Sequence, residues 1–351
     1  MFQWSVTQWG LKHLQAEPAP VPEPGPGQVL LRLHAASLNY RDLLIVEGKY
    51  NARFPRPLIP GSDGYGQVVG LGRGVPAELF HKFALTPFAP AWRSGGPDPR
   101  TLRQTLGGPL PGVLSQYRTF GVEELVFVDE PSALTALEWA TLPCAGVTAW
   151  SALVDDAGLR PGQTVVVLGT GGVALFGLQI AKMLRARVLL LSSSPEKRER
   201  SRELGADAVA DYRDRPDWGN WVLEQTGGLG ADVILETGGA GTLGQSARAV
   251  KVGGHICLIG VLSGSEEKLN LLPLLMKAVK VQGVVVGHHA HLRQLMAAYL
   301  QSFTRPVVNS VYHFEAVPEA FSLLASGNQF GKIGIDFGVE SDPTVSSPPA
   351  V

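Results

Sequence analysis

The chain has 351 residues, of which 45% are hydrophobic and 17% are charged, and its formal net charge is −1. These values predict a globular protein of about two domains, and they give no reason to expect nucleic acid or an anionic membrane as a partner. Two cysteines cannot form a disulfide framework and the first residues, MFQWSVTQWG, lack the regions of a signal peptide, so we expect a cytoplasmic protein.

The first third of the chain is rich in Pro and Gly, which predicts short strands joined by irregular segments. One strand is predicted over 28–37, QVLLRLHAAS, and another over 64–72, GYGQVVGLG. A polar loop with several Pro and Gly residues follows at 91–112. This part of the chain is therefore predicted to be β-rich.

The pattern changes at 132–159, where apolar residues recur with helical spacing. Apolar strands then alternate with helical segments; the strands are TVVVLG, RVLLLS, ADVILE and GHICLIGV. Continuous apolar strands separated by helices predict a parallel sheet covered on both faces, so 147–287 should be a doubly wound nucleotide-binding domain. Its most apolar stretch contains Pro273, Lys277 and Lys280, so we expect no membrane span there.

The last part of the chain does not continue this alternation. A helix, a strand, a helix and a strand are predicted in turn, over 290–301, 309–314, 316–327 and 331–337. We expect these elements to return to the first domain, which gives a β-rich domain over 1–146 and 288–340. The tail, 341–351, is predicted to be disordered from its composition.

The first strand of the predicted parallel sheet leads into a glycine-rich turn, Gly169-x-Gly171-x-x-Ala174. Gly169 permits a tight turn, Gly171 lets the backbone approach a pyrophosphate, and Ala174 allows the helix to pack close to the strand. The free N–H groups at the start of that helix favour a phosphate. Because the turn lies between a strand and a helix, it predicts a dinucleotide site rather than a structural turn.

The residues after the second strand indicate which dinucleotide binds. An NAD site usually places Asp or Glu at the end of this strand, whereas here Ser192 and Ser193 occupy it and Lys197 follows. Together with Tyr212, which follows the third strand, these groups suit the 2′-phosphate of NADP(H). The alternative is structural, with Ser194 capping a helix whose charged residues face solvent.

The sequence now resembles the medium-chain dehydrogenase/reductase superfamily, over nearly its whole length. The motifs that carry the resemblance are PLIPGSDGYGQVVGLG, TLPCAGVTAW, VVVLGTGGVA, ELGAD, GGAGTLGQSARAV and GGHICLIGV. The resemblance implies an α/β protein with a GroES-like β-rich catalytic domain, a Rossmann doubly wound parallel sheet and a cofactor cleft between them. The family usually has a Gly-Asp-Arg-Val turn that is missing here, which leaves the turn around His81 and Lys82 in doubt.

The zinc-dependent members of this family bind catalytic zinc through three residues whose matching positions here are Asn39, Ser62 and Cys144. Neutral Asn and Ser are poor zinc ligands, and the loop at 91–112 has none of the four cysteines of a structural zinc site. We therefore expect no metal. A lone cysteine without an evident base is not expected to be a nucleophile either, and we interpret Cys144 as a wall residue near the nicotinamide.

The sequence then resembles the zinc-free quinone oxidoreductases and enoyl reductases. Hydride transfer without a Lewis acid is easiest to an acceptor already activated by conjugation, such as a quinone or an α,β-unsaturated carbonyl. The resemblance implies Tyr50 as a donor and Asn39 as a ligand of the acceptor oxygen or the nicotinamide ribose. The residues expected to bind NADP(H) are Thr148, Gly169, Gly171, Gly172, Val173, Ser192, Ser193, Lys197, Tyr212, Gly238, Gly260, Val261, Gly287 and Lys332.

Two other functions stay open at this stage: an alcohol or aldehyde dehydrogenase, and a protein that binds NADPH without catalysis. The histidines of the GHHAH segment, at 288, 289 and 291, do not share one helix face, so we do not expect them to bind a metal. The family often forms homodimers by pairing the edges of two Rossmann sheets, and we expect the same arrangement here.

Overall fold

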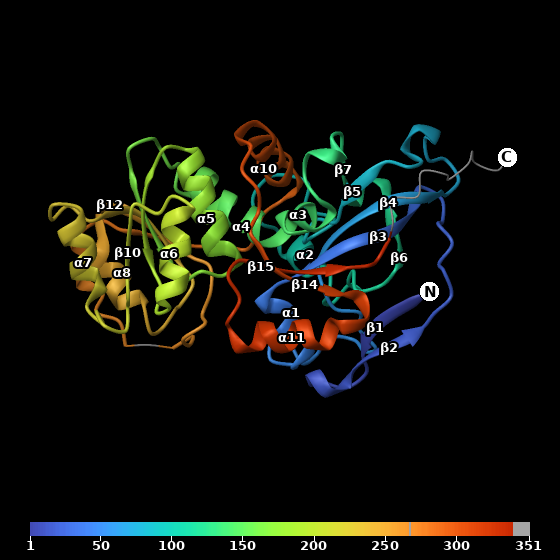
Figure 1. Ribbon diagram of the computed structural model, residues 1–351, viewed down its shortest axis with the longest axis horizontal. Helices are drawn as coiled ribbons and strands as arrows, with labels where there is room; N and C mark the ends of the chain where they lie inside the picture. Colours follow the sequence, from blue (N-terminus) through green and yellow to red (C-terminus); the bar gives the residue numbers. More distant parts are fainter. Residues whose placement is uncertain (267, 340–351) are drawn as a thin grey trace.

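The computed structural model describes residues 1–266 and 268–339, which form two large β-sheets at opposite ends of the molecule with helices between them (Figure 1). One sheet has six parallel strands in the order β10-β9-β8-β11-β12-β13. Counted from β8, this is the strand order of a doubly wound dinucleotide-binding sheet. The strands are β8 Thr164–Leu168, β9 Arg187–Leu191, β10 Ala208–Ala210, β11 Ala231–Glu236, β12 Val250–Leu258 and β13 Lys280–Gly283.

Helices cover both faces of this sheet, which explains why β8 is buried at every residue. Val165 and Val167 pack in the same core cluster as the residues of α5. Val166 points to the other face, where Trp218 and Trp221 of α7 pack. The helices of this domain are α5 Gly172–Met183, α6 Pro195–Glu203, α7 Trp218–Gln225, α8 Leu243–Ala249 and α9 Leu272–Met276.

The second sheet has seven strands in the order β14-β15-β3-β4-β5-β7, with β6 paired to β3. Its strands are β3 Gln28–Leu38, β4 Asp63–Leu71, β5 Phe83–Leu85, β6 Tyr117–Gly121, β7 Val126–Val128, β14 Val308–His313 and β15 Lys332–Asp336. A hairpin of β1 Phe2–Val6 and β2 Leu14–Pro18 lies beside it. Two short helices belong to this part of the chain, α1 Tyr40–Val46 and α2 Pro99–Leu102, and α2 lies inside the loop predicted at 91–112.

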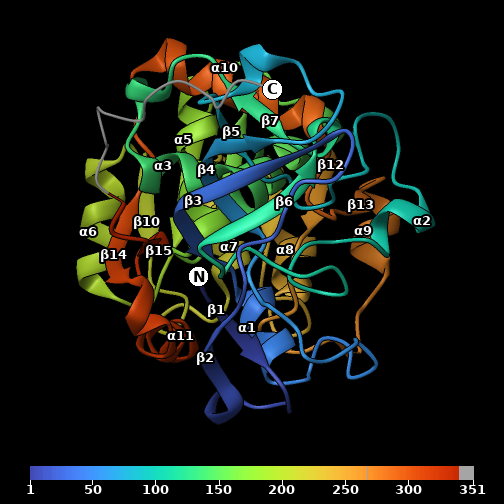
Figure 2. The ribbon, with the colours of Figure 1, turned by 90° about the vertical axis from the view of Figure 1, so that its right-hand side faces the viewer.

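The C-terminal strands lie in this second sheet, because β15 pairs antiparallel with β3 and β14 pairs parallel with β15. Helix α11 Val317–Ser326 packs against these two strands, as the view onto β3 and β6 shows (Figure 2). The chain thus returns to its first third after the parallel sheet. The α/β fold class predicted from sequence, a β-rich domain beside a doubly wound sheet, is confirmed. The predicted tail, 341–351, lies outside the described residues.

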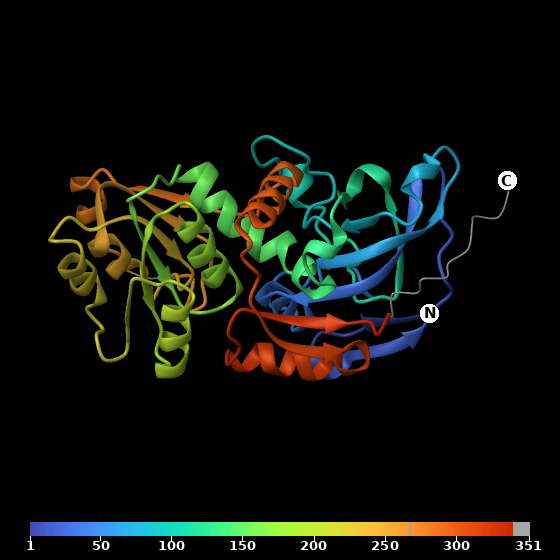
Figure 3. The same ribbon diagram turned by 45° about the horizontal axis from the view of Figure 1, so that its top comes forward.

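A long helical run crosses the predicted domain boundary at 146/147. It consists of α3 Ala136–Ala140, a π-helical segment Leu142–Gly146, α4 Val147–Trp150 and a second π-helical segment Ser151–Asp156. Helix α10 His289–Ser302 and α5 pack against this run between the two sheets (Figure 3). π-Helical segments occur frequently at functional sites.

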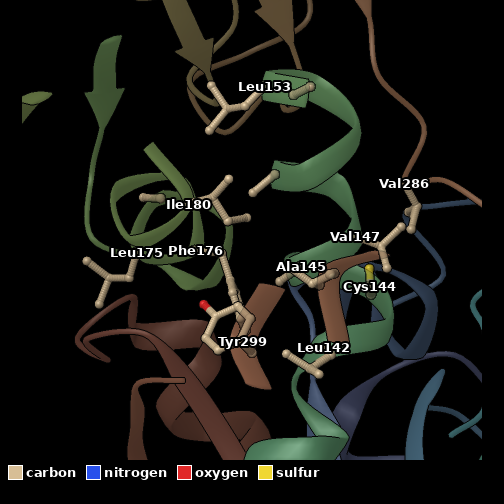
Figure 4. Close-up of a cluster of buried hydrophobic side chains, with 14 of the residues drawn as sticks. Leu142, Cys144, Ala145, Val147, Leu153, Leu175, Phe176, Ile180, Val286 and Tyr299 are labelled. Atoms are coloured by element: carbon tan, nitrogen blue, oxygen red, sulfur yellow. The ribbon is translucent and has the colours of Figure 1, made fainter. Parts of the chain in front are cut away.

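The core of this central region is built by residues from both sides of the boundary. Phe176 of α5 and Tyr299 of α10 meet edge to face, with ring centroids 5.9 Å apart, next to the helical run (Figure 4). On the side of the run near Val286 lie Val147 and Cys144. The two domains therefore share one apolar cluster.

The segment left in doubt by the missing family turn forms an ordered connection between β4 and β5. A short 3-10 helix, Ala77–Leu79, leads into it, and His81 adopts a left-handed conformation with φ 66°. The His81 amide donates to Val68 O (2.9 Å) and the Val68 amide donates to Lys82 O (2.9 Å). Further 3-10 helices cover Leu11–His13, Val122–Glu124, Pro131–Ala133 and Phe314–Ala316.

Candidate active site

The predicted dinucleotide turn lies between β8 and α5. Gly169 has φ 81°, a conformation that favours glycine, and Gly171 is the N-cap of α5. A Cβ placed on Gly169 or on Gly171 would meet no atom within 4 Å. The surface of the turn is therefore open beside the N–H groups at the start of a 12-residue helix, and this arrangement fits the pyrophosphate of a dinucleotide.

Hydroxyl groups gather after β9, where the sequence predicts the 2′-phosphate site. Ser192 is buried, and the Tyr212 hydroxyl donates to Ser193 Oγ (3.3 Å). Ser194 caps α6, since its Oγ accepts from the Lys197 amide (3.2 Å). The structure thus supports the structural role for Ser194. Ser193 and Tyr212 lie together, and their binding of a 2′-phosphate stays a prediction.

Lys197 has partners that the sequence did not suggest. Its Nζ donates to Gly327 O (3.2 Å) and Gln329 O (3.1 Å), in the loop that precedes β15. One turn further along α6, the Arg200 guanidinium lies over the Phe330 ring, 4.0 Å from its centroid. Lys197 and Arg200 therefore hold α6 against the C-terminal loop, and two of the three N–H donors of Lys197 are used within the protein.

Glu236, at the end of β11, is a site residue that our reading of the sequence missed. It is fully buried and accepts hydrogen bonds from Gly238 N (2.8 Å), Gly239 N (3.0 Å), Thr242 Oγ1 (2.6 Å) and Ser246 Oγ (2.5 Å). The carboxylate thereby fixes the loop that contains Gly238. An acidic residue that directly follows the apolar run VIL at the end of this strand was the signal available in the sequence.

The ends of β12 and β13 carry the other predicted cofactor residues. Gly260 lies so close to the preceding strand end that a Cβ would stand 2.7 Å from Thr237 O, and Val261 is 53% exposed. A Cβ on Gly287 would stand 2.6 Å from His291 Nδ1. Its neighbour Val286 has φ 51°, an uncommon conformation for a β-branched residue. Such strain is often found at ligand sites.

The GHHAH histidines form stacking and capping contacts. The rings of His288 and His291 stack with centroids 3.6 Å apart, and His291 Nε2 lies 3.4 Å from Asp155 Oδ2. Burial lowers the pKa of His288, His289 and His291. Over the described residues, no group of three or more His, Cys, Asp or Glu side chains could hold a metal ion.

Cys144 and Thr148 lie in the helical run, one turn apart. The Thr148 hydroxyl donates to Cys144 O (2.7 Å), and both side chains are buried. Burial, reinforced by the nearby negative charge of Asp63, raises the pKa of the Cys144 thiol well above its ordinary value. A thiol with a raised pKa is a weak nucleophile at neutral pH, and the role of Cys144 as a wall residue near the nicotinamide stays a prediction.

A buried polar cluster joins β3, β4 and β15 beside Cys144. The Lys332 ammonium is 3% exposed and donates to Leu38 O (2.9 Å), Asn39 Oδ1 (2.5 Å) and Asp63 Oδ2 (3.1 Å). Asp63 is fully buried and also accepts from Ser37 Oγ (3.0 Å). Lys332, predicted to bind the cofactor, instead directs its three N–H donors into the β-rich domain.

Asp42 lies at the edge of the cluster and holds the start of α1. Its Oδ2 accepts from the Asn39 amide (2.8 Å), and the side chain is fully buried. Burial raises the pKa of Asp42 to about 6, although the positive charge of Arg41 opposes the shift. Asp42 therefore holds the backbone of Asn39, while Lys332 binds the Asn39 side chain.

The three positions that match the family's zinc ligands do not fit a zinc ion. Asn39 Oδ1 already accepts from the Lys332 ammonium, and Ser62 Oγ donates to Asp63 Oδ1 (3.3 Å), which leaves the Cys144 sulfur as the one remaining candidate ligand at these positions. Zinc requires three or four nitrogen, thiolate or carboxylate ligands. A lysine ammonium bonded to one of these positions would also repel a divalent cation.

Arg41 anchors the loop predicted at 91–112. Its guanidinium donates to Leu106 O (2.9 Å), Thr105 Oγ1 (2.7 Å) and Gly108 O (2.6 Å). The same group lies 4.9 Å from the ring centroid of Tyr50, which is 48% exposed. Tyr50 is thus accessible and held next to the loop, and its role as a donor stays a prediction.

Known proteins share this architecture. Residues 25–129 match the alcohol dehydrogenase GroES-like domain family, and residues 172–302 match the zinc-binding dehydrogenase family. A zinc-type alcohol dehydrogenase-like protein of Schizosaccharomyces pombe is 35% identical over 331 residues, covering 92% of this chain and 95% of that protein. The acryloyl-coenzyme A reductase of Metallosphaera sedula is 27% identical, covering 89% of this chain and 93% of that protein.

A solved structure is also similar over almost the whole chain. The putative alcohol dehydrogenase of Sinorhizobium meliloti 1021 has a TM-score of 0.88 and 44% identity, covering 96% of this chain and 98% of that one. Within the described part of the chain, no helix is both long and apolar enough to cross a membrane. The fold, the dinucleotide turn and these relatives together show that the chain belongs to the medium-chain dehydrogenase/reductase superfamily and is a zinc-type alcohol dehydrogenase-like oxidoreductase.

Proposed function

We propose that this protein is a zinc-independent, NADPH-dependent reductase of quinones or α,β-unsaturated carbonyls. The observation that carries the proposal is the ammonium of Lys332 bonded to Asn39, at a position where zinc-dependent relatives would need a ligand. Because these side chains do not suit a Lewis-acid metal, the acceptor must be activated by its own conjugation. The acryloyl-coenzyme A reductase is a relative whose name describes this kind of acceptor.

The side chains of the site supply binding and orientation. The turn at Gly169 and Gly171 would hold the pyrophosphate, and the backbone near Gly260 and Gly287 would hold the nicotinamide end. When bound, NADPH supplies a hydride to the β-carbon of the acceptor. The π electrons of the substrate then move onto its carbonyl oxygen, which Asn39 would stabilise by a hydrogen bond. One proton, from Tyr50 or water, completes the saturated product.

The preference for NADPH rests on the hydroxyl groups after β9. No Asp or Glu occupies the strand end at 192 and 193, and the carboxylate of Asp211 is paired with Arg198 (2.6 Å). A 2′-phosphate could accept from Ser193, Tyr212 and the remaining donor of Lys197. Ser193→Asp should therefore shift preference towards NADH, whereas Ser322→Asp, at an exposed serine of α11, should not.

The decisive experiment compares NADPH and NADH oxidation over a panel of quinones and enones, with metal content measured on the same sample. We expect turnover with NADPH, at least about 10-fold higher kcat/KM than with NADH, and less than stoichiometric zinc. Stoichiometric zinc would refute the metal-free mechanism. Equal or better use of NADH would refute the assignment of Ser193, Lys197 and Tyr212.

An alcohol or aldehyde dehydrogenase is the second candidate, favoured by the names of the Schizosaccharomyces pombe and Sinorhizobium meliloti relatives. Alcohol oxidation with NADP⁺ after treatment with a chelator would support it. Tight NADPH binding without turnover of any acceptor would instead indicate a binding protein. Tyr50→Phe tests the donor role separately, and unchanged kcat would remove Tyr50 from the mechanism.

We further propose a cytoplasmic homodimer that pairs the edges of two parallel sheets. All four residues of β13 are exposed, and in the described chain this strand pairs only with β12. Exposed apolar side chains lie next to that edge; they are Leu271, Leu272, Leu275, Met276, Val281 and Val285. An exposed apolar surface of this kind is typical of an oligomer interface. A monomeric mass in sedimentation equilibrium would contradict the proposal.

A further inference from the structure

Lys332 occupies the centre of the buried polar cluster, and the geometry points to a role for it in the reaction. We propose that Lys332 is a positioning residue, whose ammonium holds the Asn39 amide so that Asn39 Nδ2 donates a hydrogen bond to the carbonyl oxygen of the substrate. The lysine would thereby take over part of the role that a metal ion plays in related enzymes. The substrate class rests on the proposed function.

Lys332 cannot itself donate to the substrate in this arrangement. An ammonium group has three N–H donors, and those of Lys332 are directed to Leu38 O, Asn39 Oδ1 and Asp63 Oδ2. The side chain is 3% exposed, so these bonds are shielded from water. Any effect of Lys332 on a bound substrate must therefore pass through one of its partners or through its electric field.

The ammonium fixes which way the Asn39 amide points. Lysine has no acceptor, so the atom that Asn39 presents to Nζ at 2.5 Å must be its oxygen. The amide nitrogen then points away from Lys332. Asn39 Nδ2 is buried and, among the described residues, has no hydrogen-bond partner. A buried amide donor without an acceptor is costly, and a ligand oxygen would satisfy it.

The surroundings of the cluster strengthen that donor. Asp63 neutralises the charge of Lys332 and is held by Ser37, so the ion pair stays fixed. The pair is buried, where electrostatic interactions are stronger than in water. An ammonium on Oδ1 polarises the amide, which makes the N–H groups of Nδ2 better donors to an oxygen that gains negative charge.

The cluster is also connected to the dinucleotide turn. The amide of Gly331, next to Lys332 in sequence, donates to Thr170 O (2.9 Å). The aliphatic part of the Lys332 side chain packs against the turn, since a Cβ on Gly172 would stand 2.7 Å from Lys332 Cδ. The side chain that orients Asn39 is thus packed against the segment that would hold the cofactor.

Arg41 is the other nearby cation, and its contacts exclude it from this role. Its terminal nitrogens bind the loop at Thr105, Leu106 and Gly108. It contacts the rings of Tyr50 and Phe88, each 4.9 Å from the guanidinium carbon. Of the two cations, Lys332 is therefore the one bonded to the Asn39 amide.

The test uses the dye 4-dimethylaminocinnamaldehyde, an enal whose absorption moves to longer wavelength when its carbonyl oxygen accepts a strong hydrogen bond. The dye is bound to the full-length protein with NADP⁺, so the readout needs no turnover. Variants are Asn39→Ala, Lys332→Arg and the pair variant Lys332→Met/Asp63→Asn, which avoids leaving an unpaired buried charge. Lys332→Gln, which has a similar shape, covers the case in which the pair variant does not fold. Lys182→Met, at the partly exposed Lys182–Asp207 pair, is the control.

We expect a red shift with the wild type, Lys332→Arg and the control, a reduced shift with Lys332→Gln, and no shift with Asn39→Ala or the pair variant. In enone reduction, Asn39→Ala should lower kcat about 100-fold, which is typical of losing one donor to an oxyanion. Adding Asn39→Ala to the pair variant should give no more loss than Asn39→Ala alone, because Lys332 acts through Asn39.

Three results would overturn the inference. They are the absence of a dye shift in the wild type, a full shift in the pair variant or in Lys332→Gln, and a loss of kcat on combining Asn39→Ala with the pair variant that equals the product of the two separate losses. The proposed function fails in a different way. A red shift in the wild type without turnover of enones or quinones would refute the function and keep the geometry. Turnover with a shift that survives the removal of Lys332 would refute the geometry and keep the function.

Discussion

The dinucleotide turn and the buried polar cluster lie side by side but are built in opposite ways. The turn uses backbone groups from one short segment, 169–174, and its Gly169 and Gly171 positions face open space. The cluster uses side chains from three strands, and its hydrogen bonds join residues 293 and 269 positions apart. A backbone site needs little more than local conformation, whereas a side-chain site exists only after the whole domain has folded.

The two regions meet at two consecutive residues. Gly331 binds the turn through Thr170 O, and Lys332 enters the cluster. Any change that moves this strand start should affect both regions, while a change confined to the open side of the turn should affect only the cofactor. Variants can therefore separate what each region contributes to stability and to binding.

The largest effect is expected from breaking the ion pair in the cluster. Asp63→Asn would leave the buried ammonium of Lys332 without its counter-charge, and removing one partner of a buried pair typically costs about 3–5 kcal/mol. Urea denaturation should show this loss in the free energy of unfolding. Adding Lys332→Met should recover much of it, and failure to recover any would mean that the pair is not what stabilises the cluster.

A smaller loss of stability is expected from Glu236→Gln. The network around Glu236 contains a buried charge, as the cluster does, but its partners are close in sequence, as in the turn. The carboxylate accepts four hydrogen bonds from residues within ten positions, and an amide nitrogen in its place would face donors. A loss of about 2–3 kcal/mol is expected, since hydrogen bonds to charged groups are strong. The affinity for NADPH should also fall, because the loop at Gly238 loses its anchor. Urea denaturation measures the loss of stability, and calorimetry measures the affinity for NADPH. An unchanged affinity would exclude this loop from the cofactor site.

This contrast also explains what the sequence could and could not predict. The turn, the strand alternation and the hydroxyl groups after β9 can be predicted from local patterns. In the structure, the turn and the hydroxyl groups follow the carboxyl ends of the neighbouring strands β8 and β9. The partners of Lys332 and Lys197 lie in segments 130 or more residues away, so no spacing in the sequence could suggest them. Glu236 was missed for another reason, since its partners are local but its burial depends on the sheet.

The contact between the turn and the buried polar cluster can be tested by substituting two adjacent glycines. Gly171→Ala places a methyl group in open space, so it should leave the thermal midpoint unchanged and weaken NADPH binding about 10-fold by blocking the pyrophosphate. Gly172→Ala would place a methyl group against Lys332 Cδ and 3.2 Å from Ala145 Cβ. It should cost about 1–2 kcal/mol of stability as well. Equal effects of the two variants on stability would contradict the contact between turn and cluster.

The smallest predicted effect is the change in the free energy of unfolding with pH. Burial lowers the pKa of His34, in β3, and of His289, at the start of α10, to about 4. The unfolded chain protonates these residues near pH 6.5, so between pH 6.5 and 4 it binds more protons than the folded chain, and stability should fall as pH falls. His289 is 1% exposed and should contribute about 1–2 kcal/mol by pH 5.

Asp42 acts in the opposite direction, because its raised pKa lets the folded chain hold a proton that the unfolded chain loses between about pH 4 and 6. The net profile therefore mixes the two signs, and a single variant is needed to isolate one of them. His289→Gln cannot titrate, so its free energy of unfolding should fall less than that of the wild type between pH 7 and 5. Equal slopes for the two proteins would show that His289 is protonated in the folded state. Loss of protection from hydrogen exchange at α10 before the parallel sheet would assign the acid sensitivity to the region around His289.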